Sequence, residues 1–302
     1  MNKTEQNLLD QIINLHDIKN ASYSIRKNGK CVKKSSNSEI EIVESKNGLD
    51  FFVKDNVQNK SLHLPVIITV GGLEDTVQNN FYIGKNCNIT IVSGCGIHNT
   101  SKNKSSHSGN HNFYVGQNST VKYIEKHYAN ESSSEKILNP VTKIFADKSS
   151  KIEIQTMQFG GVSYSNRKTT ATLKENSSLV VKEKIVTSNK HIAKTNFKVN
   201  LKGKNSSCNI SSRSVAKDFS KQVFVSNIVG ENECFGHIEC DAILLDSAVV
   251  ESTPKITAKN NLASLTHEAS IGKIASEQII KLQTLGLSET QAQDQIIKGF
   301  LN

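Results

Sequence analysis

A repeat of about 30 residues is the feature that most constrains the fold of this 302-residue chain. The segment NFYIGKNCNITIV begins at Asn80 and returns without a gap as NFYVGQNSTVKYI at Asn112, 32 residues later. Weaker copies follow, each with an apolar strand, a turn rich in Gly, Lys, Asn and Ser, and a second alternating strand. Their turn residues are spaced by 30, 28 and 29 residues (Asn118, Lys148, Asn176 and Asn205). A fixed period with two strands per repeat predicts a mainly β fold, a β-solenoid whose corners use residues that accept a left-handed backbone.

The composition agrees with an elongated fold that has a thin core. Hydrophobic residues make up 36% of the chain, proline occurs 3 times and tryptophan is absent. The formal net charge of +9 would suit an anionic partner such as nucleic acid or a membrane surface. The lysines are scattered, however, and no platform of arginines and aromatic residues is found, so we expect no nucleic-acid partner.

The N-terminal sequence lacks the apolar run of a signal peptide. No segment approaches the roughly 20 apolar residues that span a membrane, so we expect a cytoplasmic protein with no membrane partner. In that compartment cysteines are mostly reduced thiols, and the absence of a CxxC motif disfavours a closed zinc knuckle. The chain has six cysteines (Cys31, Cys87, Cys95, Cys208, Cys234 and Cys240).

Helical patterns occur at the two ends of the chain. Residues 5–19 predict a short amphipathic helix with four apolar residues on one face (Leu8, Leu9, Ile12 and Leu15). Residues 273–285 and 289–301 predict a helical hairpin, in which Gly286 fits the C′ position of the first helix and Ser288 with Gln291 forms a capping box for the second.

These patterns suggest three parts. They are an N-terminal helical and strand segment (1–60), a β-helix core (61–271) and a C-terminal helical domain (272–302).

Two strand-like segments near the C-terminus carry a candidate ligand set. In GHIECDAILL, Cys240 shares the apolar parity of the strand, and in ASLTHEA, His267 does so while Glu268 faces the other way. Cys240 and His267 are 27 residues apart, close to one repeat, and adjacent coils stack about 4.8 Å apart. We therefore expect both side chains to point into apolar surroundings near each other. From the residues alone, a packing role remains the commoner one for such a cysteine or histidine.

The stretch from Gly236 to Phe300 closely resembles the C-terminal core of SufB and SufD, scaffold proteins of the SUF iron–sulfur assembly system. The resemblance covers roughly residues 60–302 and is strongest after Val225. It implies a right-handed parallel β-helix with an N-terminal helical segment and a C-terminal helical hairpin.

The resemblance also implies roles for individual residues. Cys240, in the segment IECDA, would accept sulfide and the nascent Fe–S cluster. His267 matches the histidine that SufB shares with SufD, and Glu268 matches a residue typical of SufB. A second cysteine of some SufB proteins, in the strand near Phe145, is absent, and Cys208 or Cys234 could replace it. Cys234 has the parity of Cys240 unless a turn intervenes, as the nearby Glu231, Asn232 and Gly236 suggest.

The family pattern further implies partners. The C-terminal hairpin would bind a SufC-like ABC ATPase, since its apolar residues exceed what a small cap needs (Ile279, Leu282, Leu285, Ile296 and Phe300). This chain has no Walker A motif, so we do not expect it to be an enzyme itself. We expect a homodimer joined through C-terminal strands, with a heterodimer with a sister SufB or SufD protein as the alternative. Apoproteins would receive the transient cluster.

A second group of potential ligands lies earlier in the chain, with CxxH and HxxxH spacing (Cys95, His98, His107, His111 and His127). The surrounding sequence is rich in Ser, Asn and Gly, which equally suits a polar surface loop, so the sequence does not assign a metal site here. Two other functions stay open. One is a β-helix metalloenzyme that uses these histidines, and the other is a structural partner of a SufB-type scaffold that binds no metal.

Overall fold

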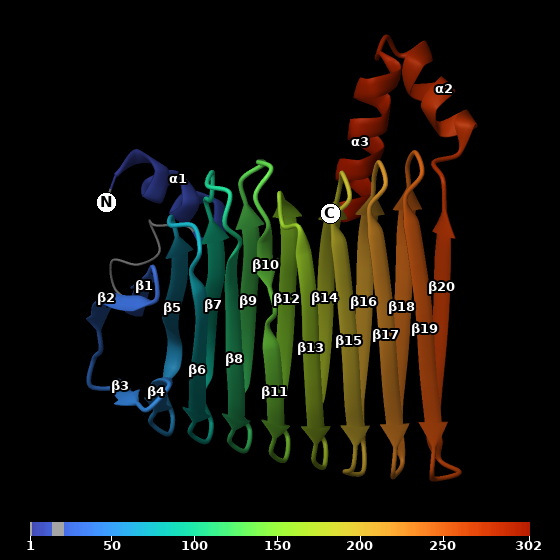
Figure 1. The fold of residues 1–302 in the computed structure, drawn as a ribbon. Helices are drawn as coiled ribbons and strands as arrows, with labels where there is room; N and C mark the ends of the chain where they lie inside the picture. Colours follow the sequence, from blue (N-terminus) through green and yellow to red (C-terminus); the bar gives the residue numbers. More distant parts are fainter. Residues whose placement is uncertain (1, 14–20) are drawn as a thin grey trace.

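Two long β-sheets form a solenoid of about eight turns, with one helix at the N-terminus and two at the C-terminus (Figure 1). This computed structural model describes residues 2–13 and 21–302. The first sheet has the strand order β2-β1-β5-β7-β9-β12-β14-β16-β18-β20. The second has the order β19-β17-β15-β13-β10-β8-β6-β4-β3, and β11 pairs with β13 and β8 beside this path.

The strands are β1 (Ser22–Lys27), β2 (Lys30–Ser35), β3 (Ile40–Ser45), β4 (Gly48–Val53), β5 (Gln58–Ile68), β6 (Glu74–Ile83), β7 (Asn88–Ile97), β8 (Ser105–Val115), β9 (Thr120–Ala129), β10 (Lys136–Leu138), β11 (Val141–Ala146), β12 (Lys151–Gly160), β13 (Tyr164–Leu173), β14 (Ser178–Thr187), β15 (Ile192–Leu201), β16 (Ser206–Ala216), β17 (Lys221–Gly230), β18 (Cys234–Leu244), β19 (Val249–Ala258) and β20 (Ala263–Gly272). The helices are α1 (Lys3–Ile12), α2 (Ser276–Thr284) and α3 (Glu289–Leu301).

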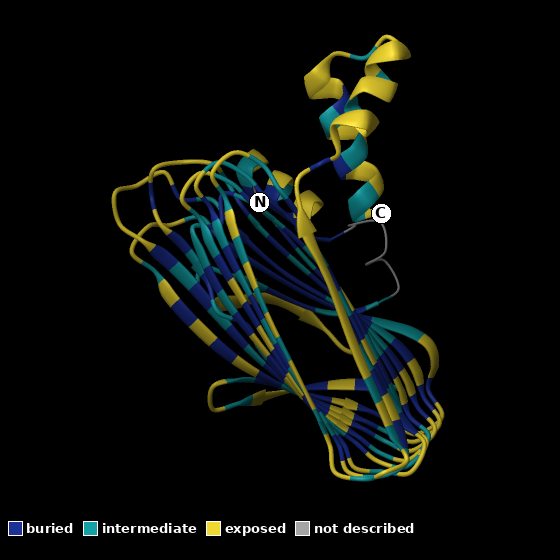
Figure 2. Ribbon diagram, turned by 90° about the vertical axis from the view of Figure 1, so that its right-hand side faces the viewer, coloured by how far each residue is buried: buried dark blue, intermediate teal, exposed yellow. Residues whose placement is uncertain are grey.

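The sequence repeat corresponds to the stacking of coils. Asn80 of β6 pairs with Asn112 of β8 in a parallel register, as the alignment of the two copies predicts. Side chains alternate between the two faces of each strand, so one residue in two points into the solenoid. These inward residues are buried along most of the coil stack (Figure 2). The first four strands depart from this plan, because β1 with β2 and β3 with β4 form antiparallel hairpins.

Asparagine side chains shape the corners between the sheets. Asn86, Asn118, Asn176 and Asn205 all have positive φ angles, a conformation that Asn tolerates better than most residues. Hydrogen bonds link these side chains from coil to coil, with 3.2 Å from Asn118 Nδ2 to Asn86 Oδ1 and the same distance from Asn205 Nδ2 to Asn176 Oδ1. The sequence placed one of these turn positions at Lys148, but the left-handed residue is its neighbour Ser149, with a φ of 57°.

Stacked aromatic rings fill the N-terminal half of the core. The ring centroids of Phe51 and Phe81 lie 4.9 Å apart, and those of Phe81 and Phe113 lie 4.5 Å apart. The buried ring of Tyr123 packs against Phe113 from the opposite sheet at 4.9 Å. Because the three phenylalanines come from equivalent positions of their coils, the parallel register alone brings their rings together.

Helix α1 lies against β5, β7 and β9 and buries Leu8, Leu9 and Ile12. Its first turn is closed by a capping box between Asn2 and Glu5. The predicted helix 5–19 is therefore present, but it begins two residues earlier and ends at Ile12, because Ile13 has an extended backbone; residues 14–19 of the prediction lie outside the described residues.

The C-terminal hairpin projects beyond the strand ends of the last coils (Figure 1). Gly286 follows α2 with a φ of 93°, and Ser288 and Gln291 form the predicted capping box of α3. Ile274 and Ile297 anchor the hairpin against Val215 and Ile243 of the solenoid. Within the described chain, no helix has the length and apolar character needed to cross a membrane.

The corner asparagines give a test of this fold. Replacing Asn118 by alanine should lower the free energy of unfolding by about 1 kcal/mol more than replacing it by glycine, because alanine resists the left-handed conformation and glycine does not. Both changes remove the same side-chain hydrogen bond, so their difference isolates the backbone term. Urea denaturation of the two variants measures it. Equal destabilisation would contradict the assigned corner conformation.

Candidate functional site

Cys240 lies on the inward face of β18, one strand before the C-terminal edge of the first sheet. Its residue is 2% exposed, and its neighbours in the parallel register are Ser212 on β16 and Ala269 on β20. Burial raises the pKa of the Cys240 thiol, and the nearby Ser252 on β19 offsets part of this effect. The prediction that Cys240 points into apolar surroundings is confirmed, with a polar edge formed by the two serines.

His267 lies on the last strand of the first sheet, in register with Ile238. It is two residues from Leu265, which packs on the core, so it shares the inward parity that the sequence predicts. His267 is nevertheless exposed, and the expectation that it points into apolar surroundings is wrong. The reason is its place in the stack, because no further coil covers β20 in the part of the chain that the structure describes (Figure 2). In the register, Ile238 and not Cys240 is its direct neighbour.

Glu268 faces outward, as its parity predicts, and its side chain is largely exposed. Its Oε1 lies 3.2 Å from Nε2 of His237, which sits on the same outer face. Within one chain, Glu268 and Cys240 therefore lie on opposite faces of the first sheet. Across residues 2–13 and 21–302, no group of three or more His, Cys, Asp or Glu side chains is arranged to hold a metal ion.

Cys208 and Cys234 are also buried on the inward face. Strand β18 begins at Cys234, so the turn that the sequence suggested between Cys234 and Cys240 is absent from this described segment. Cys208 is in register with Gly236 and Cys234 with Ala263, so neither is a register neighbour of Cys240. Burial raises the pKa of both thiols, most strongly that of Cys208.

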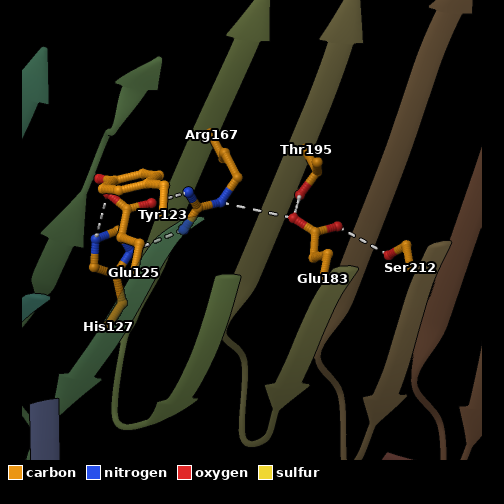
Figure 3. A network of polar contacts seen from close by, with 7 residues as sticks. All are labelled: Tyr123, Glu125, His127, Arg167, Glu183, Thr195 and Ser212. Atoms are coloured by element: carbon orange, nitrogen blue, oxygen red, sulfur yellow. Dashed lines mark hydrogen bonds and ion pairs between the residues drawn. The ribbon is translucent and has the colours of Figure 1, made fainter. Parts of the chain in front are cut away.

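A buried polar network, which the sequence analysis did not predict, occupies the middle of the solenoid (Figure 3). Arg167 on β13 donates a hydrogen bond to Glu125 on β9, and its Nη2 lies 3.1 Å from Nδ1 of His127. The hydroxyl of Tyr123 donates to Glu125 Oε1 at 3.0 Å. On its other side, the Nε of Arg167 lies 3.6 Å from Oε1 of Glu183 on β14.

This network leads towards Cys240. Glu183 accepts hydrogen bonds from Thr195 at 3.0 Å and from Ser212 at 2.9 Å, and Ser212 is the register neighbour of Cys240. The parallel register places one inward residue from each of six successive strands of the first sheet side by side. Each of these residues is polar, and the last of them is Cys240. The members of this polar column are Ser93, Glu125, Thr156, Glu183, Ser212 and Cys240.

The sequence held a signal for this network. Along VKYIEKHYA, Glu125 has the same parity as the core residues Val121 and Tyr123, and along NRKTTATL, Arg167 has the parity of Ala171. A charged side chain at an inward position needs a buried partner of opposite charge. The sequence does not show that Glu125 pairs with Arg167, because the two residues are far apart along the chain and lie on different sheets.

The earlier group of potential ligands also lies inside the solenoid. Cys95, His107, His111 and His127 are buried and line one cavity of about 730 Å³ near the N-terminal end of the coil stack. Cys95 and His127 are register neighbours on β7 and β9. His98 does not line this cavity. The interpretation of this region as a polar surface loop is therefore wrong for these four residues, because the strands β7, β8 and β9 carry them on their buried faces.

Comparison with known proteins identifies the family of this chain. Residues 74–300 match the model of the SUF system FeS cluster assembly, SufBD core domain. The chain belongs to the SufBD family. It is 30% identical over 269 residues to an iron–sulfur cluster assembly SufBD family protein of Pyrococcus horikoshii, an alignment that covers 85% of this chain and 79% of that protein. It is 26% identical over 242 residues to such a protein of Methanocaldococcus jannaschii, with coverage of 80% and 76%.

The buried carboxylates of this SufBD core are stabilised by the buried cation Arg167. Burial alone would raise the pKa of Glu125, but Arg167 and His127 outweigh it and hold that pKa well below its usual range. Burial raises the pKa of Glu183, with Arg167 opposing the rise. Burial also lowers the pKa of His111 to about 4 and that of His127 to about 3, so both imidazoles are neutral at pH 7.

Arg167 is therefore expected to be a principal electrostatic support of the core. Replacing Arg167 by methionine leaves Glu125 buried without its cation, which should cost about 3–5 kcal/mol of unfolding free energy at pH 7. In the wild type the lowered pKa of Glu125 adds stability above the unfolded value near 4.5, and this is lost as the pH falls. In the variant the pKa of Glu125 should rise, so that stability decreases as the pH increases above 4.5.

Urea denaturation at pH 5 and pH 7 tests this reversal. Replacing Lys148 by methionine is the control, because its ion pair with Glu175 is exposed and should contribute little. A loss for the Arg167 variant that is as small as the control, or that does not grow from pH 5 to pH 7, would contradict the assigned role.

Proposed function

We propose that this chain is a scaffold on which a nascent iron–sulfur cluster is assembled, with Cys240 as its central ligand. Membership of the SufBD family, which implies a role in Fe–S cluster assembly, supports the general function. The observation that carries the specific assignment is the position of Cys240 beside the open end of the solenoid, one strand from the exposed His267. The cluster is the cargo of the protein, to be passed on to recipient apoproteins.

The ligand chemistry suits a transient cluster. Thiolate is the preferred protein ligand of iron–sulfur units. We assign His267 and Glu268 as the further ligands, and imidazole and carboxylate bind a cluster more weakly than thiolate, which favours release. Cys208 and Cys234 are the alternative thiols, and their burial away from the edge makes them less suitable.

The assembled site needs a second subunit. Strands β19 and β20 end the two sheets, and no other described strand pairs with their outer edges. Exposed edges of ten residues each are ready to pair with further strands. Pairing of these strands between two copies would cover His267 and bring Glu268 side chains of both copies to one interface. A homodimer is the assembly proposed, and a heterodimer with a sister SufB or SufD protein is the alternative.

The energy for assembly would come from a partner. The chain is proposed to have no enzymatic activity of its own, and a SufC-like ABC ATPase would bind α2 and α3 in the cytoplasm. Ile280 and Leu285 support this surface, since they are 56% and 75% exposed. Of the five apolar residues that the sequence assigned to the docking surface, Leu285 is exposed and Leu282 is partly exposed. The other three, Ile279, Ile296 and Phe300, pack against the apolar cluster where the hairpin meets the solenoid.

Replacing Cys240 by serine tests the scaffold function. The change in volume is small, so the fold should persist, while the iron and sulfide retained after anaerobic reconstitution should fall to a small fraction of the wild-type amount. The exposed Cys31, replaced by serine, is the matched control and should retain its cluster. Unchanged iron and sulfide in the Cys240 variant would overturn the assignment and favour a structural partner that binds no metal.

Replacing Ile280 and Leu285 together by serine tests the ATPase partner. Both side chains project into solvent, so the double variant should keep the thermal stability of the wild type while co-purification of a SufC-like ATPase is lost. Phe219, 68% exposed outside the hairpin, provides the control when it is replaced by serine. Retained binding by the double variant would place the docking surface elsewhere.

A further inference from the structure

The cavity at the N-terminal end of the solenoid contains two histidines that point to a common place. His107 and His111 lie on the inward face of β8, separated by Gly109 on the same face. A Cβ atom added to Gly109 would lie 2.7 Å from Nε2 of His111 and 3.4 Å from Nε2 of His107. The absence of a side chain at Gly109 therefore leaves open a space that both imidazole nitrogens border.

The two imidazoles differ in their hydrogen-bond partners. Nδ1 of His107 lies 2.9 Å from Oδ2 of Asp75, and Arg26 pairs with that carboxylate through two hydrogen bonds of 2.9 and 2.6 Å. A carboxylate on one ring nitrogen orients the imidazole and leaves the other nitrogen available, as in many metal sites. His111 is 5% exposed, and among the described residues its Nδ1 has no hydrogen-bond partner.

The packing of His111 does not require an imidazole. Its ring lies 5.9 Å from the ring of Phe81 and 6.0 Å from that of Tyr123, contacts that an apolar side chain would make equally well. Burying a polar ring beside an aromatic stack costs free energy when a ring nitrogen is unsatisfied. The open space lies beside Nε2 of His111, the ring's other nitrogen, and a ligand bound there would give the imidazole a role that an apolar side chain cannot fill.

We propose that this cavity binds one divalent first-row transition-metal ion through Nε2 of His107 and Nε2 of His111. Imidazole is a favoured ligand for such ions. No set of three ligands is preassembled in the described chain, so water completes the coordination in the cavity of about 730 Å³. Metal–imidazole bonds are about 2.0–2.1 Å long, so the two rings would close on the ion when it binds. The site is separate from Cys240 and does not depend on the proposed function.

The direct test is anaerobic titration of the untagged 302-residue chain with Co²⁺ alone, followed by calorimetry and by visible d–d absorption. The wild type should bind one tightly held ion per chain. Replacing Gly109 by alanine keeps both histidines but places a methyl group between them, and its backbone is outside the left-handed region, so the fold should persist. This variant should bind Co²⁺ at least about tenfold more weakly, as should the variant with His111 replaced by glutamine.

Two controls complete the experiment. Replacing Gly299 by alanine tests the same chemical change where nothing lies within 4 Å of the new methyl group, and it should bind as the wild type does. Replacing Cys240 by serine should also leave this Co²⁺ site intact, which separates it from the cluster site. The proposal is overturned if the wild type binds no Co²⁺, or if the folded Gly109 variant binds it with unchanged affinity and spectrum.

Discussion

Parallel pairing of strands at a constant register is the interaction on which the rest of this structure depends. Each coil places its residues directly beside equivalent residues of the next, so one inward position becomes a continuous column through the solenoid. Phe51, Phe81 and Phe113 stack for this reason, and so do the corner asparagines. The hydrophobic content of 36% is sufficient because only the inward half of each strand must be apolar.

The same register makes the buried charges tolerable. Glu125 and Glu183 belong to one column of the first sheet, and Arg167 reaches between them from the second. Each carboxylate has further hydrogen bonds from hydroxyl groups, so the cost of burial is shared over several contacts. Cys240 stands at the end of this column, where the stack of coils stops and the polar interior meets the exposed strand β20.

Much of the fold could be predicted because its determinants are local and repeated. The gapless copies at Asn80 and Asn112 gave the register directly, and Ser288 with Gln291 gave the start of α3. The exposure of His267 could not be predicted from parity, because parity assigns a face and does not say whether another coil covers it. The inward orientation of the β8 histidines could not be predicted either, because Ser, Asn and Gly mask the alternation of that strand. The pairing of charges between the two sheets becomes visible only when the coils are stacked.

The proposed cluster site lies at the open end of the solenoid, so we expect the site to be completed when the dimer forms. The most direct measurement is X-ray diffraction at the iron edge from crystals of the anaerobically reconstituted protein. Our account predicts anomalous peaks for iron within bonding distance of Cys240 Sγ, at an interface where β19 and β20 of two subunits pair. Iron held elsewhere in the chain, with Cys240 unliganded and both strand edges free, would contradict it.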